Sequence, residues 1–137
     1  MEPDFPVEFV VEGTPISLQA KRAESRTQWK EQVRKASRAV LPEGYWATAD
    51  RISATLFYFP SGEMQGDIDN IVKPILDALV QHIYVDDSQV ERVVVQKFEP
   101  ARIFVFGAPS VTLARAMDAP KPLLYVRLSK DPFEELS

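Results

Sequence analysis

Four aspartates and one lysine gather around a single apolar segment of the chain: Asp67, Asp69, Lys73, Asp86 and Asp87. Carboxylates held close together repel one another, which raises their pKa values and destabilises the fold. A hard divalent cation removes this repulsion, and Mg²⁺ prefers one or two carboxylates together with waters and phosphate oxygens. A lysine beside such an ion offsets the charge that builds on phosphorus during phosphoryl transfer. The residue types therefore favour a magnesium site for phosphoryl chemistry, in which the metal activates a water.

Each pair of aspartates also has an ordinary structural explanation. Aspartates at the start of a helix cap free N–H groups and complement the helix dipole, and Asp-Asp-Ser is typical of turns. Ser88 and Glu91 have the spacing of a capping box, but the strand-like sequence after them argues against one. Either pair alone is more often structural, whereas the two pairs around Lys73 together favour a site.

The segment between the two pairs has the apolar period of a helix, at Ile68, Val72, Ile75, Leu76, Leu79 and Ile83. Pro74 would cost about 3 kcal/mol inside this helix, because its ring clashes with the carbonyl of Asn70 and leaves that carbonyl unpaired. We therefore expect the regular helix to begin close to Pro74, after an extended or turning stretch. On an extended stretch Asp67 and Asp69 point the same way, and the turn after the helix can return beside them.

The rest of the chain alternates between strand and helix patterns and predicts one α+β (mixed α/β) domain over residues 1–137. An amphipathic helix is expected at 26–40, with Trp29 and Val33 on its apolar face. A short helix is expected within 110–119, and the acidic tail at about 130–137 is expected to fray. Strands are expected at 6–13, 51–60, 93–98, 101–106 and 122–129.

Composition narrows the chemistry further. The chain of 137 residues is 45% hydrophobic and 26% charged, as in ordinary soluble domains. Without cysteine, disulfides and thiolate sites are excluded, and a single histidine, His82, makes serine-histidine-aspartate triads and zinc sites poor candidates. No apolar run reaches the roughly 18 residues of a membrane span, and the N-terminus lacks a signal-peptide pattern. We expect a cytoplasmic protein with no membrane partner, whose metal is held by oxygen.

The net charge of −4 argues against a nucleic-acid partner at first sight, but the charge is unevenly distributed. Residues 20–40 carry seven basic and two acidic side chains, a balance of +5. Without the four aspartates around Lys73, which a bound cation would neutralise, the net charge is 0. Five basic residues recur every four positions and form a candidate DNA-binding stripe, with a solvated helix face as the alternative: Arg22, Arg26, Lys30, Arg34 and Arg38.

The stretch "GDIDNIVKPILDALVQHIYVDDSQVERVVVQKF", residues 66–98, closely resembles the core motif of the RusA family of Holliday junction resolvases. That motif reads D-x-D-N-x-x-K-x-x-x-D-A-L, followed by D-D-x-Q-V and a downstream lysine. "VEGTPISLQAKR", residues 11–22, more loosely resembles the family's N-terminal strand and turn. By this resemblance the metal-binding catalytic aspartates are Asp67, Asp69 and Asp87, and the catalytic lysine is Lys73. Four further positions match supporting residues of the family: Asn70, Asp77, Asp86 and Lys97.

The resemblance implies a single domain with a mixed sheet packed by two main helices. It also implies a Mg²⁺-dependent endonuclease of branched DNA, with Mn²⁺ as a substitute metal and no organic cofactor. The family works as a homodimer, and two-fold symmetry suits the paired nicks that resolve a four-way junction. Two other functions stay open at this point: a non-catalytic RusA-like accessory factor of phage type that binds DNA or protein, and a metal-dependent nuclease of other branched DNA or RNA.

Overall fold

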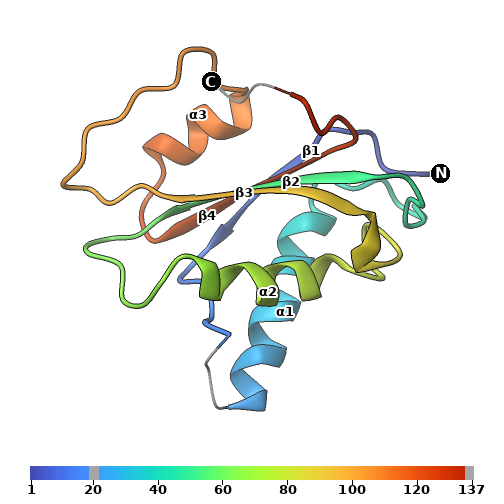
Figure 1. Cartoon of the computed structure of the whole chain (residues 1–137), viewed down its shortest axis with the longest axis horizontal. Helices are drawn as coiled ribbons and strands as arrows, with labels where there is room; N and C mark the ends of the chain where they lie inside the picture. Colours follow the sequence, from blue (N-terminus) through green and yellow to red (C-terminus); the bar gives the residue numbers. More distant parts are fainter. Residues whose placement is uncertain (19–21, 135–137) are drawn as a thin grey trace.

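The structure, a computed structural model, describes residues 1–18 and 22–134. In this part of the chain it has three α-helices, one short 3-10 helix and a four-stranded mixed sheet, which confirms the predicted α+β class (Figure 1). In chain order the elements are β1 (Val7–Glu12), α1 (Ala23–Arg38), β2 (Ile52–Phe59), α2 (Asp69–Leu79), η1 (Asp87–Gln89), β3 (Val90–Lys97), α3 (Val111–Asp118) and β4 (Leu123–Ser129).

The strand order is β1-β4-β2-β3. β4 pairs antiparallel with both β1 and β2, whereas β2 and β3 are parallel. Parallel neighbours need a crossover connection, and here α2 and η1 supply it. The crossover therefore carries one predicted pair of aspartates before α2 and the other pair after it.

α2 begins at Asp69, so the prediction that the regular helix begins near Pro74 is wrong. The N–H of Leu18 donates to the carbonyl of Asn70 at 2.6 Å, and this is the carbonyl that a proline four residues later leaves unpaired. A hydrogen bond from a distant segment thus offsets part of the cost of Pro74. The expected extended stretch through Asp69 is also wrong, because Ile68 and Asp69 already have helical geometry.

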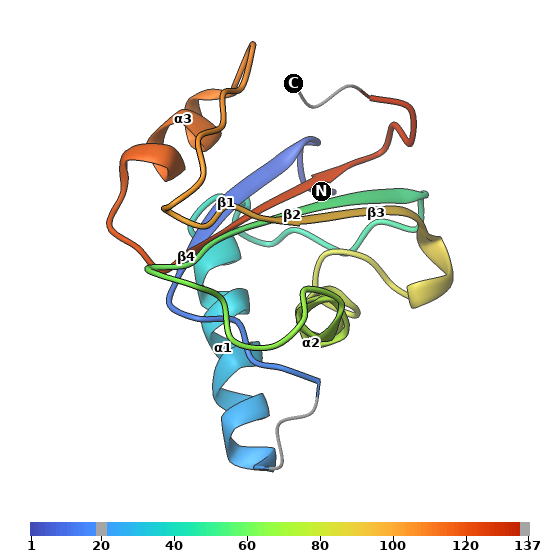
Figure 2. The same cartoon turned by 60° about the vertical axis from the view of Figure 1, so that its left-hand side comes forward.

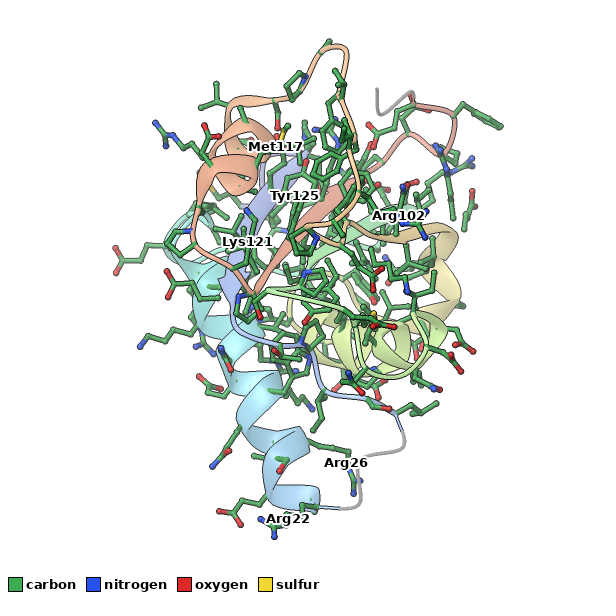
Figure 3. All side chains as sticks on the ribbon, turned by 90° about the vertical axis from the view of Figure 1, so that its left-hand side faces the viewer. Arg22, Arg26, Arg102, Met117, Lys121 and Tyr125 are labelled. Atoms are coloured by element: carbon green, nitrogen blue, oxygen red, sulfur yellow. The ribbon has the colours of Figure 1, made fainter. Side chains whose placement is uncertain are left out.

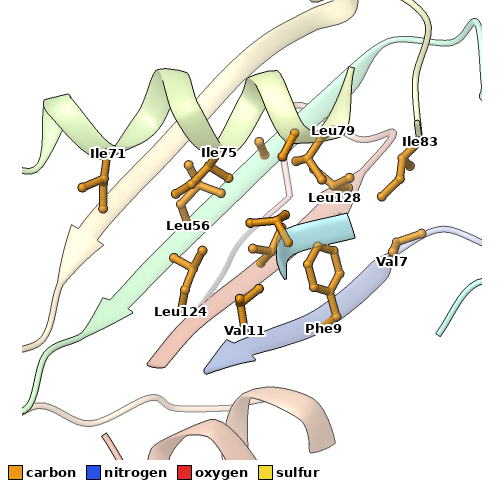
Figure 4. Close-up of a cluster of buried hydrophobic side chains, with 14 of the residues drawn as sticks. Val7, Phe9, Val11, Leu56, Ile71, Ile75, Leu79, Ile83, Leu124 and Leu128 are labelled. Atoms are coloured by element: carbon orange, nitrogen blue, oxygen red, sulfur yellow. The ribbon is translucent and has the colours of Figure 1, made fainter. Parts of the chain in front are cut away.

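One hydrophobic core lies between the sheet and the pair α1 and α2 (Figure 2). Ile71, Ile75 and Leu79 of α2 pack toward Leu56 and Leu124 of the sheet (Figure 4). All five side chains are buried. Because the apolar face of α2 packs against the sheet, the polar residues of this helix lie on the outside of the molecule.

The opposite face of the sheet is covered by α3 and by the segment before it (Figure 2). The predicted strand at 101–106 is wrong, because these residues pair with no strand in the described part of the chain. Phe104 and Phe106 instead pack on an aromatic cluster, with the rings of Phe98 and Phe104 4.6 Å apart. The alternation in this segment thus reflects packing on the face of a sheet. The predicted short helix is confirmed as α3, capped by Ser110, whose Oγ accepts from the N–H of Leu113.

The C-terminal tail is held to the sheet as far as it is described, so the expectation that it frays from residue 130 is wrong for 130–134. Arg127 donates to both carboxylate oxygens of Glu134, at 3.1 and 3.0 Å. Arg92 donates to the backbone carbonyls of Pro132 and Glu134. Residues 135–137 of the predicted tail lie outside the described residues. None of the helices in the described part has the length and apolar character that a membrane crossing needs.

Candidate active site

Lys73 lies at the centre of a small charged cluster on the outer side of α2. Its Nζ is 2.8 Å from Oδ1 of Asp77, one helical turn later, and 3.3 Å from Oδ2 of Asp87 in η1. The hydrogen bond to Asp77, and then that to Asp87, raise the pKa of Lys73. Lys73 is therefore a cation at neutral pH, which suits it to stabilise negative charge and makes it a poor general base.

The turn that carries the second pair of aspartates is closed by a capping box. A carboxylate oxygen of Asp86 accepts from the N–H and the hydroxyl of Ser88, and these contacts lower the pKa of Asp86. The side chain of Gln89 completes the box by accepting from the N–H of Asp86 at 2.8 Å. The capping box in the structure is formed by Asp86 and Gln89. It lies two residues before Ser88 and Glu91, the residues whose spacing resembles a capping box in the sequence.

Gln89 holds the turn of Asp87 in place, a role that the sequence analysis did not predict. Its Oε1 accepts from the N–H groups of Val85 and Asp86, both at 2.8 Å. Its Nε2 donates to the carbonyls of Thr48 and Asp50, at 2.8 and 2.7 Å. One amide thus uses both donors and both lone pairs and ties the turn of Asp87 to the segment before β2. The glutamine of D-D-x-Q-V, at the third position of a capping box, was the available signal.

The first pair of aspartates is much less constrained. Asp67 and Asp69 are exposed, and among the described residues neither side chain forms a hydrogen bond or ion pair. Gly66, directly before them, has a φ of +81°, in the left-handed region that glycine tolerates best. Asp67 borders a cleft of about 230 Å³ between the 60–66 loop and the segment around Pro15.

Lys97, a predicted supporting residue, contacts Glu99, which in turn binds the loop that lines this cleft. Its Nζ is 3.4 Å from Oε2 of Glu99. The same oxygen of Glu99 accepts from the N–H of Met64 in the 60–66 loop at 2.8 Å. Lys97 thus lies one contact away from the loop that leads to Asp67.

The three predicted metal ligands do not form a ready-made cluster in the described part of the chain, where no three acidic or histidine side chains are arranged to hold a metal. Asp87 contacts Lys73, whereas Asp69 lies one turn before Lys73 at the start of α2, with Asp67 two residues earlier, and neither forms an ion pair with Lys73 in the described part of the chain. The donor set nevertheless suits Mg²⁺, which needs only one or two carboxylates because water and phosphate complete its shell. The unpaired carboxylates of Asp67 and Asp69 meet this requirement.

The candidate DNA-binding stripe on α1 divides into two parts. Arg22 and Arg26 are exposed at the N-terminal end of α1, which projects from the rest of the molecule (Figure 3), and Lys30 is exposed one turn later. Arg34 is instead half-buried, and its guanidinium donates to the carbonyls of Ala78 and Val80 at the end of α2, at 2.8 and 3.3 Å. The idea of one solvent-facing stripe is therefore wrong for Arg34, which stabilises the C-terminus of α2.

Arg38, the last residue of the stripe, pairs with Glu31 at 2.9 Å on the surface. The N-terminal residues Arg26 and Lys30 border a groove of about 290 Å³ that reaches Pro74 and Asp77 of α2. The exposed part of the stripe thus lies beside the cluster of Lys73.

His82 connects the turn after α2 to α1 and to the loop that follows α1. Its ring nitrogens hydrogen-bond the hydroxyls of Ser37 and Tyr45, at 2.7 and 3.0 Å. Burial, reinforced by the positive charges of Arg34 and Arg38, lowers the pKa of His82 to about 4. His82 is therefore neutral at physiological pH.

Comparison with known proteins agrees with this picture. A family model described as "Endodeoxyribonuclease RusA" matches residues 13–106, most of the chain and all of the elements that carry the candidate site. A comparison with curated proteins finds no match. The RusA match implies the nuclease activity of a Holliday junction resolvase, and the mixed sheet with its helices is consistent with a RusA domain. The chain belongs to the RusA endodeoxyribonuclease family.

Proposed function

We propose that this protein is a Mg²⁺-dependent endodeoxyribonuclease that resolves Holliday junctions in the cytoplasm by paired symmetric nicks. We further propose that it acts as a homodimer, that Mn²⁺ can replace Mg²⁺, and that it needs no organic cofactor. The observation that carries this proposal is the contact of Lys73 with both Asp77 and Asp87, within the region that matches the family. These contacts hold a cation beside carboxylates from two segments, where it can stabilise the negative charge of a phosphoryl transition state.

In this proposal Asp67, Asp69 and Asp87 hold the metal. Bound Mg²⁺ would lower the pKa of an attacking water and polarise the scissile phosphate. Lys73 keeps its proton and lies where it can oppose the negative charge that develops on the phosphate. Asp77 orients the ammonium group of Lys73 from one turn along α2.

Gln89 and Asp86 have a positioning role in the same proposal. They hold the backbone on both sides of Asp87 through hydrogen bonds that do not involve its carboxylate. Arg26 and Lys30, which line the groove that ends at Asp77, and the exposed Arg22 just before α1 supply phosphate contacts. These contacts would bind the DNA backbone without reading its sequence.

The decisive experiment is cleavage of a synthetic four-way junction with each strand labelled in turn. We expect paired nicks at symmetric positions in Mg²⁺ or Mn²⁺, no nicks in EDTA, and little cleavage of the matching linear duplex. A substrate panel with flaps, forks and RNA distinguishes a nuclease of other branched substrates. Absence of metal-dependent cleavage from every substrate would reject the enzymatic proposal.

The net charge of −4 and the internal use of Arg34 favour the alternative of a non-catalytic accessory factor. Such a factor would bind a junction or a protein with no need of metal. A gel-shift titration in EDTA tests for this binding. Junction binding without cleavage under any metal would replace the resolvase proposal with the accessory function.

A further inference from the structure

Strand β3 lies at one edge of the sheet and pairs on one side only. Among the described residues its partner is β2, so its other side has no strand beside it (Figure 1). β3 is eight residues long and has three consecutive valines, of which Val93 is 39% exposed. A long apolar edge strand is a ready template for pairing with another chain.

The direction of the β3 backbone groups limits how a partner strand can bind. The N–H of Phe98 donates to the carbonyl of Tyr58 in β2. Because N–H and C=O groups alternate sides along a strand, the groups of Arg92, Val94 and Gln96 also point toward β2. Those of Val93, Val95 and Lys97 point outward. The regular stretch begins at Arg92, because Val90 pairs with Ile52 and Arg92 with Ser53, which makes Glu91 the bulged residue at the start of this edge.

We propose that β3 pairs antiparallel with β3 of a second copy of this chain, about a two-fold axis at Val94. The two sheets of four strands would join into one of eight. This inference rests on the homodimer of the proposed function and names its surface. The axis gives an isologous contact, as closed dimers require, and places α2 of both copies on the same face of the joined sheet.

Charge complementarity selects this axis among those that the backbone allows. Antiparallel partners must both face outward or both face inward, so a two-fold axis has to pass through a residue and not between two residues. An axis at Val94 sets Val93 opposite Val95 of the second copy. It also brings Glu91 near the second copy's Lys97, a match that the symmetry makes twice.

The neighbouring axes lack this match. An axis at Val95 sets Glu91 opposite Glu99, two like charges, and an axis at Val93 sets Glu91 opposite Val95. In the described part of one chain Glu91 pairs with Arg51 at 3.6 Å and Lys97 with the partly buried Glu99 at 3.4 Å, and the side chains of Glu91 and Lys97 are themselves exposed. Such surface pairs are weak, so both side chains can exchange partners when two copies meet.

Cysteine cross-linking tests the axis directly, since the chain has no cysteine of its own. In the proposed dimer the two copies of residue 94 form a non-hydrogen-bonded pair with Cα atoms about 4.5 Å apart, within the range of a disulfide. We expect Val94→Cys to give mainly covalent dimer with diamide as oxidant. Val93→Cys is the matched control: its thiol is more exposed but faces residue 95, so it should cross-link at least about tenfold more slowly. Equal or faster cross-linking of the control would overturn the proposal.

Charge reversal tests the register without a covalent bond. Lys97→Glu sets like charges against each other at two symmetric places, so the dimer dissociation constant should rise at least about tenfold. The double variant E91K/K97E restores opposite charges and should return the constant to within about threefold of the wild type. Sedimentation velocity over a concentration series measures both constants. A double variant as weak as the single variant, or a wild type that stays monomeric, contradicts the proposal.

Junction cleavage by the wild type, measured on the same samples, separates the two proposals. Metal-dependent nicking without cross-linking through Val94→Cys rejects this surface and leaves the proposed function in place. Cross-linking in the absence of nicking supports the surface and counts against the resolvase function.

Discussion

The two aspartate pairs at either end of the α2 crossover are similar in composition but are held very differently. Asp86 and Asp87 lie in a turn closed by a capping box, and Gln89 connects that turn to residues 48 and 50. Asp67 and Asp69 follow a glycine with positive φ and have no side-chain partner in the described part of the chain. Asp86 and Asp87, the fixed pair, are therefore pre-organised by the fold, whereas Asp67 and Asp69, the adaptable pair, are free to move.

This difference suits a site that holds a cation and a phosphate. Fixed carboxylates alone would keep their mutual repulsion in the metal-free protein. Here Lys73 neutralises the fixed pair, through its contact with Asp87, while the carboxylates of the adaptable pair stay in water. The arrangement lowers the cost of the metal-free state and leaves Asp67 and Asp69 open to a cation.

The largest expected effect comes from removing a ligand in the adaptable pair. Asp69→Asn should slow junction nicking at least about a thousandfold, because metal-assisted water activation is lost, while junction affinity in Ca²⁺ stays nearly unchanged. Asp4→Asn, a change of another exposed aspartate, is the control and should cleave like the wild type. Wild-type nicking rates for Asp69→Asn would show that the adaptable pair is not part of the metal site.

Lys73→Ala tests the link between α2 and the fixed pair. A positioned cation at the transition state typically contributes about 3 kcal/mol, so single-turnover nicking should slow about 100-fold with little change in affinity. Lys35→Ala removes an exposed lysine of α1 that forms no ion pair in the described part of the chain and should have no such effect. Equal losses in rate and affinity would instead assign Lys73 to phosphate binding.

Gln89→Ala should convert the fixed pair into a second adaptable one. Loss of its four hydrogen bonds should lower the free energy of unfolding by about 2 kcal/mol. Nicking should slow about tenfold, and the Mg²⁺ concentration for half-maximal rate should rise because Asp87 is no longer held. Gln28→Ala, at an exposed glutamine of α1, controls for loss of the side chain. An unchanged Mg²⁺ dependence would limit Gln89 to a structural role.

His82 should make the stability of the fold depend on pH, because it holds the segment between α2 and the fixed pair. Its pKa is about 4 in the folded protein and about 6.5 when unfolded, so the unfolded state binds more protons between these values. The contribution of neutral His82 to the free energy of unfolding should be fully present above pH 6.5 and should decline as the pH falls toward 4. After allowance for partial exposure, the loss from pH 7 to pH 5 is about 1 kcal/mol.

Urea unfolding of the wild type and of His82→Gln at several pH values measures this contribution. The variant should be less stable at pH 7, since it loses the contacts with Ser37 and Tyr45, but its stability should change less with pH. Parallel curves for the two proteins would contradict the assignment to His82.

The smallest effect is expected at Gly66, ahead of the adaptable pair. A Cβ there would meet no neighbour within 4 Å, so the cost of Gly66→Ala is the strain of a positive φ alone, about 1 kcal/mol. Gly62→Ala, in the same loop but without positive φ, should change stability by less. Thermal unfolding compares the two variants, and equal midpoints would show that this backbone conformation is not required.

Local patterns in the sequence were sufficient for most of the fold. Period-two and period-3.6 patterns predicted the four strands, α1 and α3 to within a few residues and the apolar face of α2, but they placed the start of α2 too late and added a strand at 101–106. The residue types also predicted the chemistry of the candidate site, oxygen ligands beside a lysine, and this stays a prediction. Motif spacing led to the same family that the comparison shows.

Contacts between distant segments decided the remainder. α2 begins at Asp69 because the N–H of Leu18 satisfies the carbonyl that Pro74 leaves free. Asp87 is held because Gln89 reaches carbonyls about 40 residues earlier in the chain. Residues 103–106 alternate without forming a strand because Phe104 and Phe106 pack on the aromatic face of the sheet and pair with no strand in the described part of the chain. Local sequence sets which faces are apolar and which side chains can react, but the partner that satisfies a given backbone group is chosen only when the chain packs.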